Sequence, residues 1–276
     1  MFDSIAGDYD ALNHILSLDV DKIWRRKALK QIVDAPAPAQ VLDLACGTGD
    51  FSIAIAKALS RSHKRVGTPI EAHVKAPAKV PVEAQVTSTG FVTGDSGRSD
   101  LMTKGHVTGV DLSEGMLAVM REKVGKAGLT EMISIEEGDG ENLRFPDNTF
   151  DRVTIAFGIR NFENREKGLR EMLRVLKPGG RLVILELSRP ENKIIRWFYD
   201  LYFLHILPKV GGKVSGDKAA YAYLPASVAA FPGKKAFMAT MREAGFRAVT
   251  HKAFTLGICR MYTGEKIGKK AWHLNY

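Results

Sequence analysis

Short apolar runs alternate along most of the chain with longer stretches in which apolar residues recur every three or four positions. The first pattern predicts buried β-strands, and the second predicts amphipathic α-helices. Strands are expected at residues 40–45, 106–111, 132–136, 150–156, 181–187, 246–252 and 255–262. Helices are expected in two pieces between residues 9 and 33, and at residues 51–59, 114–126, 164–176, 193–207 and 234–244. This alternation predicts an α/β fold whose mostly parallel sheet is covered by helices on both faces.

The rhythm is lost between residues 60 and 105, where prolines and glycines interrupt an irregular run of valines. We interpret this segment as an irregular insertion, because nothing in it has a catalytic pattern. No clear linker separates two cores. The sequence therefore predicts a single domain over residues 1–276, with a helical cap at residues 1–38 and a further helix and loop at residues 190–232.

A turn with two glycines, Gly47 and Gly49, lies between the first expected strand and the next helix. Such a turn exposes backbone N–H groups at the carboxyl edge of a parallel sheet, where α/β folds bind nucleotide-like ligands. Both glycines are therefore candidate binding residues. The dinucleotide fingerprint requires a third glycine where this chain has Ser52, so NAD is disfavoured.

Asp111 ends the second expected strand, where a carboxylate can accept hydrogen bonds from both hydroxyls of a ribose. It lies 62 positions after Gly49, and subtracting an insertion of roughly 40 residues restores the usual spacing of about 20. The alternative role, capping the following helix, suits Ser113 better. After the third strand, Asp139 is placed to accept from an adenine amino group, and Gly140 lets the backbone approach the ring.

Composition adds a basic bias that is confined to the last third of the chain. The 276 residues carry a formal net charge of +9, with 45% hydrophobic and 26% charged residues. Residues 189–276 hold 15 Lys and Arg against 5 Asp and Glu, together with 14 of the 23 aromatic residues. A basic and aromatic segment is typical of proteins that contact nucleic acid or a lipid surface.

The cysteine content and the first residues indicate in which cellular compartment the protein is expected. The two cysteines, Cys46 and Cys259, exclude a disulfide framework and a four-cysteine zinc site, and no metal site is expected. Residues 1–10 have neither the basic nor the apolar part of a secretory signal. We therefore expect a cytoplasmic protein.

Four segments, in this order, resemble successive motifs of the class I S-adenosylmethionine methyltransferases: residues 43–50, 109–117, 138–147 and 173–180. More narrowly, three segments resemble the quinone C-methyltransferases that complete menaquinone and ubiquinone: Phe2-Asp-Ser-Ile-Ala, Phe157-Gly-Ile-Arg-Asn161 and Phe254-Thr-Leu-Gly-Ile. The resemblance covers nearly everything except residues 60–105. It implies a Rossmann-like fold with a seven-stranded sheet and S-adenosylmethionine as the cofactor.

The resemblance also implies an activity and a set of cofactor contacts. The activity is C-methylation of a polyprenylated quinol ring, most closely that of demethylmenaquinol to menaquinol. A benzoquinol precursor of ubiquinone or another lipid-like small molecule is the alternative. The implied contacts are Thr48, Asp111, Asp139, Gly140 and Ala156. The family often has serine in place of Ala156 and alanine in place of Gly140, and Asp43 is either a brace of the glycine loop or a buried strand carboxylate.

Arg160 and Asn161 follow the fourth expected strand, where acceptor-side residues of this fold lie. A cation or general base near a phenolic oxygen helps to make the ring carbon nucleophilic, so both are catalytic candidates. The alternative for Arg160 is a simple ion pair with an acidic neighbour. Tyr221 and Tyr223 are expected in the pocket wall, in the core or in contact with the acceptor.

The partners follow from the charge distribution and from the implied substrate. Residues 194–207 are apolar almost all round, so a core helix is the default expectation for them. The implied substrate has a polyprenyl tail, however, which favours a role of this helix as a lid or as an apolar groove for the tail. The basic segment then favours peripheral contact with the inner face of the cell membrane. Enzymes of this fold that methylate nucleic acid usually have Asn/Asp-Pro-Pro-aromatic where this chain has Ala156-Phe-Gly-Ile159, so no nucleic-acid partner is expected. A homodimer and a non-catalytic regulator that binds S-adenosylmethionine stay open.

Overall fold

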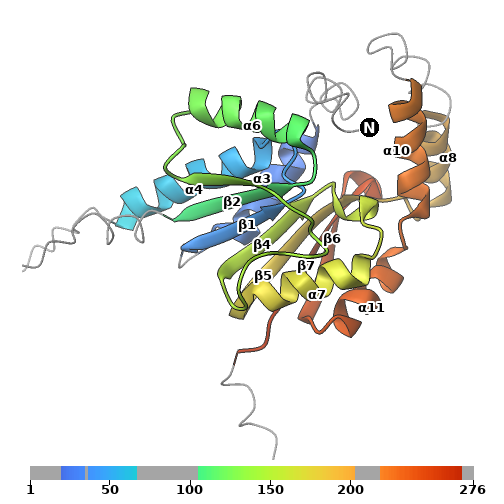
Figure 1. The fold of residues 1–276 in the computed structure, drawn as a ribbon. Helices are drawn as coiled ribbons and strands as arrows, with labels where there is room; N and C mark the ends of the chain where they lie inside the picture. Colours follow the sequence, from blue (N-terminus) through green and yellow to red (C-terminus); the bar gives the residue numbers. More distant parts are fainter. Residues whose placement is uncertain (1–19, 35–36, 67–104, 203–217, 269–276) are drawn as a thin grey trace, which may run out of the picture.

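The computed structural model describes residues 20–34, 37–66, 105–202 and 218–268 (Figure 1). Within them, seven strands form one sheet in the order β3-β2-β1-β4-β5-β7-β6. The strands are β1 (Gln40–Leu44), β2 (His106–Asp111), β3 (Ile133–Glu137), β4 (Phe150–Ala156), β5 (Leu176–Leu187), β6 (Arg247–Phe254) and β7 (Cys259–Glu265). Strands β1 to β5 are parallel, and β7 runs antiparallel to β5 and β6. This sheet confirms the expected seven-stranded, mostly parallel α/β fold.

Helices cover both faces of the sheet (Figure 1). One face packs against α3 (Val20–Ile32), α4 (Asp50–Val66) and α6 (Glu114–Lys126), and the other against α7 (Arg165–Val175) and α11 (Lys234–Glu243). Two hydrophobic cores result, one on each side. Strand β1 lies between them, and its Val41, Leu42 and Leu44 are fully buried, which explains why it is an apolar run without alternation.

The register of the central strands positions the candidate site. Leu44 at the end of β1 is level with Val110 of β2 and Ile155 of β4. The next residue along each strand therefore emerges at the same carboxyl edge of the sheet. These residues are Ala45, Asp111 and Ala156.

Two helices stand side by side at this carboxyl edge, α8 (Lys193–Leu201) and α10 (Lys218–Ala230) (Figure 1). Tyr199 of α8 and Val228 of α10 form a small buried cluster with Leu187 and Ile258, which lie at the ends of β5 and β7. A short 3-10 helix, η1 (Ile159–Asn161), follows β4 and contacts α10. The turn that carries Arg160 and Asn161, the residues expected on the acceptor side, thus lies against α10 beside the ends of the strands.

Two expected elements differ in the structure, and one helix was not expected. The strand expected at residues 255–262 begins only at Cys259, because Thr255 and Leu256 adopt positive φ angles of 44° and 56° in the turn η3 (Thr255–Gly257). The helix expected at residues 51–59 continues to Val66 as α4. Helix α10 was not expected as a separate helix, and it contains Pro225, which is unfavourable inside a helix.

Other expectations fall outside the described residues or are not tested. The first N-terminal helical piece, most of the insertion (residues 67–104) and residues 203–207 lie outside. A single domain over residues 1–276 stays a prediction.

Candidate active site

Asp111 connects the loop after β1 to the loop after β2. Its Oδ2 accepts a hydrogen bond from the backbone N–H of Gly47 at 2.9 Å, and its Oδ1 accepts one from the N–H of Ser113 at 2.9 Å. Ser113 itself caps α6, because its Oγ accepts from the N–H of Met116 at 3.3 Å. The expectation that Ser113 is the cap is confirmed.

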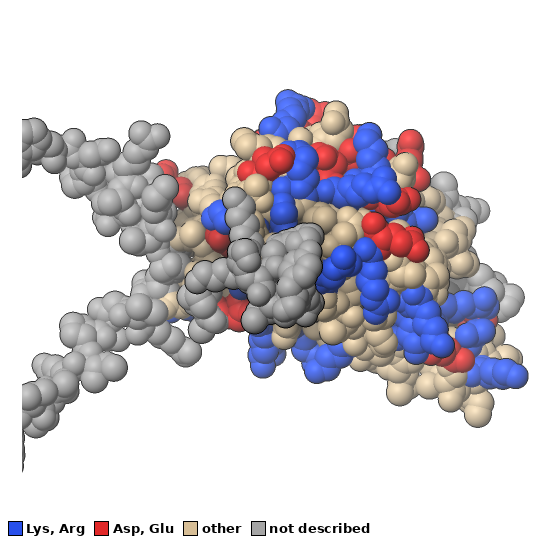
Figure 2. Space-filling view, turned by 90° about the horizontal axis from the view of Figure 1, so that it is seen from below, with Lys and Arg blue, Asp and Glu red and all other residues tan. Residues whose placement is uncertain are grey.

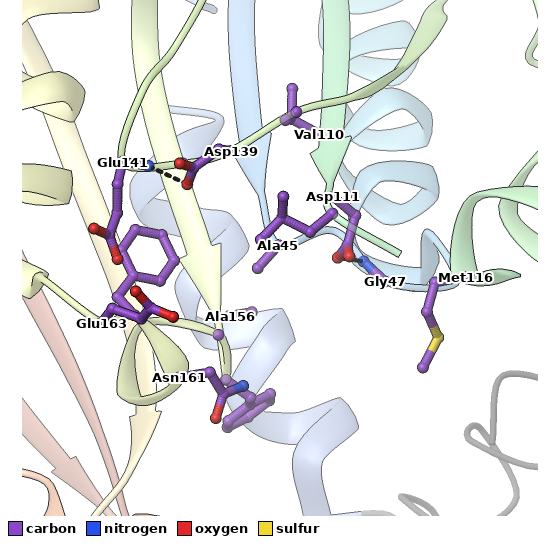
Figure 3. Close-up of a pocket in the computed structure, with 16 residues that line it drawn as sticks. Ala45, Gly47, Val110, Asp111, Met116, Asp139, Glu141, Ala156, Asn161 and Glu163 are labelled. Atoms are coloured by element: carbon purple, nitrogen blue, oxygen red, sulfur yellow. Dashed lines mark hydrogen bonds between the residues drawn. The ribbon is translucent and has the colours of Figure 1, made fainter. Parts of the chain in front are cut away.

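A cavity of about 340 Å³ opens at the carboxyl edge of the sheet (Figure 3). It brings together six of the residues expected to form the site: Gly47, Asp111, Asp139, Gly140, Ala156 and Asn161. Asp139 has its Oδ1 2.8 Å from the N–H of Glu141, which shapes the loop after β3. We call this space the main cavity.

Phe162 lines the main cavity and was not expected from the sequence. Its ring occupies the space next to two glycines: a Cβ atom on Gly140 would lie 2.6 Å from Phe162 Cζ, and one on Gly168 would lie 2.5 Å from Phe162 Cδ2. An alanine at position 140, common in the resembled family, would therefore require the ring to shift. The signal for Phe162 was its position directly after Asn161, but only the fold brings the two glycines beside it.

A smaller hollow adjoins the main cavity and shares four lining residues with it: Ala45, Gly47, Ala156 and Phe157. It is lined in addition by Asp43 and Thr48, both expected, and by Arg25 of α3, which was not expected.

Asp43 is buried at the end of β1 and joins the glycine loop to the helix that follows. Ser52, in the first turn of α4, donates from its Oγ to Asp43 Oδ2 at 2.6 Å. Burial raises the pKa of the Asp43 carboxyl to about 7, although the Ser52 hydrogen bond and the charge of Arg25 act to lower it. The contact with Ser52 joins β1 to the first turn of α4, and a role of Asp43 in bracing the glycine loop stays a prediction.

Gly49 lines neither space among the described residues. It has a φ of +83°, and a Cβ atom there would lie 2.4 Å from Met120 Cγ of α6. The glycine is thus required for helix packing against the loop, and its expected contact with a cofactor stays a prediction.

Arg160 and Asn161 take different positions although they are adjacent. Arg160 is buried, and its Nη1 lies 2.9 Å from Oε1 of the fully buried Glu186, while its Nε lies 3.3 Å from Ser227 Oγ. It is not among the residues that line the main cavity. Asn161 does line the cavity, and its Oδ1 accepts a hydrogen bond from the hydroxyl of Tyr223 on α10 at 2.8 Å.

Glu186 could have been noticed in the sequence, because it interrupts the apolar run of the fifth strand. The structure therefore contains the ion pair that was the alternative for Arg160. A direct catalytic role for Arg160 stays a prediction.

Comparison with known proteins identifies the family. The profile of the ubiE/COQ5 methyltransferase family matches residues 1–266. The chain belongs to this family. A demethylmenaquinone methyltransferase of Bacteroides fragilis is 40% identical over 96% of this chain and 91% of its own length. A ubiquinone/menaquinone biosynthesis C-methyltransferase, UbiE, of Geobacter sulfurreducens is 42% identical over 96% of this chain and 87% of its own length.

Solved structures share the fold of this ubiE/COQ5 family member. An S-adenosylmethionine-dependent methyltransferase from Aquifex aeolicus has a TM-score of 0.52 and 19% identity, covering 88% of this chain and 89% of its own. The cyclase SpnF has a TM-score of 0.56 and 16% identity, covering 88% and 82%. Because a cyclase shares the fold, the fold alone does not determine the reaction.

S-adenosylmethionine is the cofactor of this ubiE/COQ5 family member, and the residues of the site fit it. Asp111 offers carboxylate oxygens at the rim of the main cavity, and Asp139 offers one in the loop after β3. Ala156 has no side-chain hydrogen-bonding group, so only its backbone can take part.

Proposed function

We propose that this chain transfers the methyl group of S-adenosylmethionine to a ring carbon of a polyprenylated quinol, most closely converting demethylmenaquinol to menaquinol. The observation that carries the proposal is the 40% identity over 96% of the chain to a demethylmenaquinone methyltransferase. The geometry supports it, because the main cavity extends from Asp111 and Asp139 to Asn161 beside α10.

The bound cofactor supplies a methyl group that is already activated on a sulfonium, so the protein has mainly to position the acceptor. Asn161 is suited to this task. Tyr223 donates to its Oδ1, and its Nδ2 group is a donor that a ligand in the cavity lined by Asn161 can use. A donor at this position stabilises the phenolate that makes the quinol ring carbon nucleophilic. Glu186 accepts hydrogen bonds from both the guanidinium and the backbone N–H of Arg160, which fixes the chain next to Asn161.

The test is radiolabelled methyl transfer into extracted quinones, with demethylmenaquinol and a benzoquinol precursor of ubiquinone offered in parallel. We expect label in menaquinone. Label only in the benzoquinol product would move the proposal to ubiquinone synthesis, as the name of the Geobacter relative allows. Tight cofactor binding without transfer to either acceptor would contradict the proposal and favour a regulator.

A peripheral contact with the membrane is the second part of the proposal. One side of α8 carries Tyr199 into the core, and the other side exposes a stripe at three- and four-residue spacing. Its side chains are Ile194, Trp197, Phe198 and Leu201, which are 71%, 61%, 60% and 39% exposed. Exposed Trp and Phe beside Lys193 suit the interface of an anionic bilayer, which a polyprenylated substrate would occupy.

The face seen from below in Figure 2 does not favour a nucleic-acid partner, which is typically bound by a continuous basic surface. On the face shown in Figure 2, Lys and Arg side chains lie among Asp and Glu side chains and form no uninterrupted basic surface. No helix within the described ranges is long and apolar enough to cross a membrane. A homodimer stays a prediction.

Co-sedimentation with vesicles tests the membrane contact. We expect the protein to pellet with vesicles rich in phosphatidylglycerol but not with pure phosphatidylcholine, and the double substitution Trp197→Ser and Phe198→Ser to abolish pelleting. Ile267→Ser is the matched control, because Ile267 is 38% exposed but directly follows Lys266, which bonds to Gly180 at the opposite end of β5. Equal pelleting of wild type and the α8 variant would contradict the assignment.

A further inference from the structure

Arg25 of α3 lines the smaller hollow and has no role in the site as described so far. Its side chain is only 18% exposed, and its Cζ lies 5.8 Å from the centre of the Phe157 ring. Phe157 belongs to both spaces and has a φ of 62°, which is rare for a bulky residue and typical of functional sites. Through Arg25, helix α3 thus contacts the edge of the cofactor site.

The guanidinium of Arg25 is held by long contacts. Its Nη1 lies 3.3 Å from Asp50 Oδ2, and its Nη2 lies 3.6 Å from Asp21 Oδ2, whereas well-formed charge-assisted bonds measure about 2.7–2.9 Å. Asp50 also pairs with Lys123, so this carboxylate is shared between two cations. The Arg25 Nε atom is buried and has no hydrogen-bond partner within the part of the chain that the structure describes. A buried donor of this kind favours a further acceptor.

The hollow carries charges of both signs. Arg25 contributes a guanidinium, and Asp43 contributes a carboxyl group on the strand side. The methionine end of S-adenosylmethionine is an α-amino acid, with a carboxylate and an ammonium on one carbon. A carboxylate is the ligand that the planar guanidinium fork binds best.

We propose that Arg25 binds the carboxylate of the methionine moiety of S-adenosylmethionine, with Asp43 facing its ammonium. The inference rests on the proposed function only in taking this cofactor as the ligand. It assigns the smaller hollow to the amino acid end, beside a main cavity that holds Asp111 and Asp139. Helix α3 then belongs to the cofactor site as well as to the core.

Calorimetric titration with S-adenosylmethionine and with its decarboxylated analogue tests the inference without any turnover. For wild type we expect tighter binding of the carboxylate-bearing compound. Arg25→Gln should weaken its binding by about 10- to 100-fold, the range for a hydrogen bond to a charged group, and leave the decarboxylated compound unaffected. Arg26→Gln is the matched control, because Arg26 is the exposed neighbour on the same helix with the same charge.

The outcomes separate the two proposals. If wild type binds neither compound, the proposed function fails. If it binds S-adenosylmethionine and Arg25→Gln keeps the full preference for the carboxylate, only the role of Arg25 fails. Should Arg25→Gln not fold, Arg25→Lys replaces it: weaker binding of S-adenosylmethionine alone supports the role, and unchanged binding of both compounds overturns it.

Discussion

The cofactor end and the acceptor end of the site are built in different ways. At the cofactor end, the Asp111 carboxylate is held by the backbone amides of Gly47 and Ser113, which belong to the loops directly after β1 and β2. At the acceptor end, side chains hold side chains from distant elements: Tyr223 of α10 bonds to Asn161, and Ser227 bonds to Arg160.

This difference has a physical consequence. Backbone amides at strand ends are fixed by the sheet, so the cofactor end keeps its geometry when nearby side chains change. The acceptor end depends on the docking of α10, and its geometry changes with any partner in the network. Substitutions at the two ends should therefore separate cofactor affinity from turnover.

The largest effect is expected at the acceptor end, from Arg160→Met. It leaves the fully buried Glu186 without its cation, which should lower the free energy of unfolding by about 3–5 kcal/mol in urea titrations. Adding Glu186→Gln should restore part of this loss, because no buried charge is then left unpaired. In folded protein, lost turnover with intact cofactor affinity would support a catalytic role for Arg160, and unchanged turnover would exclude one.

Asp43 gives the cofactor end a pH dependence. Its pKa in the folded protein is about 7, above the ordinary value of 3.8, so the folded state binds an additional proton between these values. Stability should therefore fall as pH rises from about 4 through about 7. Asp43→Asn removes this penalty and should raise the free energy of unfolding at pH 8 by roughly 2–4 kcal/mol relative to wild type, with little difference at pH 3. A variant with the same pH profile as wild type would contradict this.

At the cofactor end, the substitution Asp111→Asn removes a negative charge from the main cavity. Loss of a charged acceptor for the ribose hydroxyls should weaken binding of S-adenosylmethionine by about 100-fold, measured by calorimetry. Ser113→Ala is the control, because it removes the cap of α6 at a cost of about 1 kcal/mol in stability and should leave the affinity unchanged. Equal losses of affinity in both variants would show that loop order, not the carboxylate, determines binding.

The smallest effect is expected from Tyr223→Phe. It removes the hydroxyl that orients the Asn161 amide and should reduce kcat about fivefold, the equivalent of about 1 kcal/mol, with the KM for S-adenosylmethionine unchanged. A change in that KM instead of kcat would place Tyr223 at the cofactor end and remove the distinction between the two regions.

A different distinction, between residues at strand ends and residues on docked helices, decides what the sequence could predict. Gly47, Asp111 and Asp139 follow strands whose apolar runs are visible, and parallel strands end at a common edge, so their convergence was predictable. Arg25 and Tyr223 lie on helices whose docking depends on contacts across the fold.

The differences between the predicted and the observed secondary structure also arise from contacts and conformations that the residue types do not indicate. The turn at residues 255–257 places Thr255 and Leu256 in left-handed conformations, which their residue types do not indicate. Helix α10 forms in spite of Pro225, since burial of Val228 against Tyr199 stabilises it.

The ring of Phe162 connects the width of the main cavity to a helix behind it. Gly168 is buried in α7 and is not among the lining residues, yet any side chain there would meet the ring within 2.5 Å. An alanine is a better helix former by about 1 kcal/mol, so the substitution favours α7 while it displaces the ring. The width of the main cavity thus depends on a residue that does not line it, so a substitution of Gly168 can change ligand affinity without replacing any lining residue.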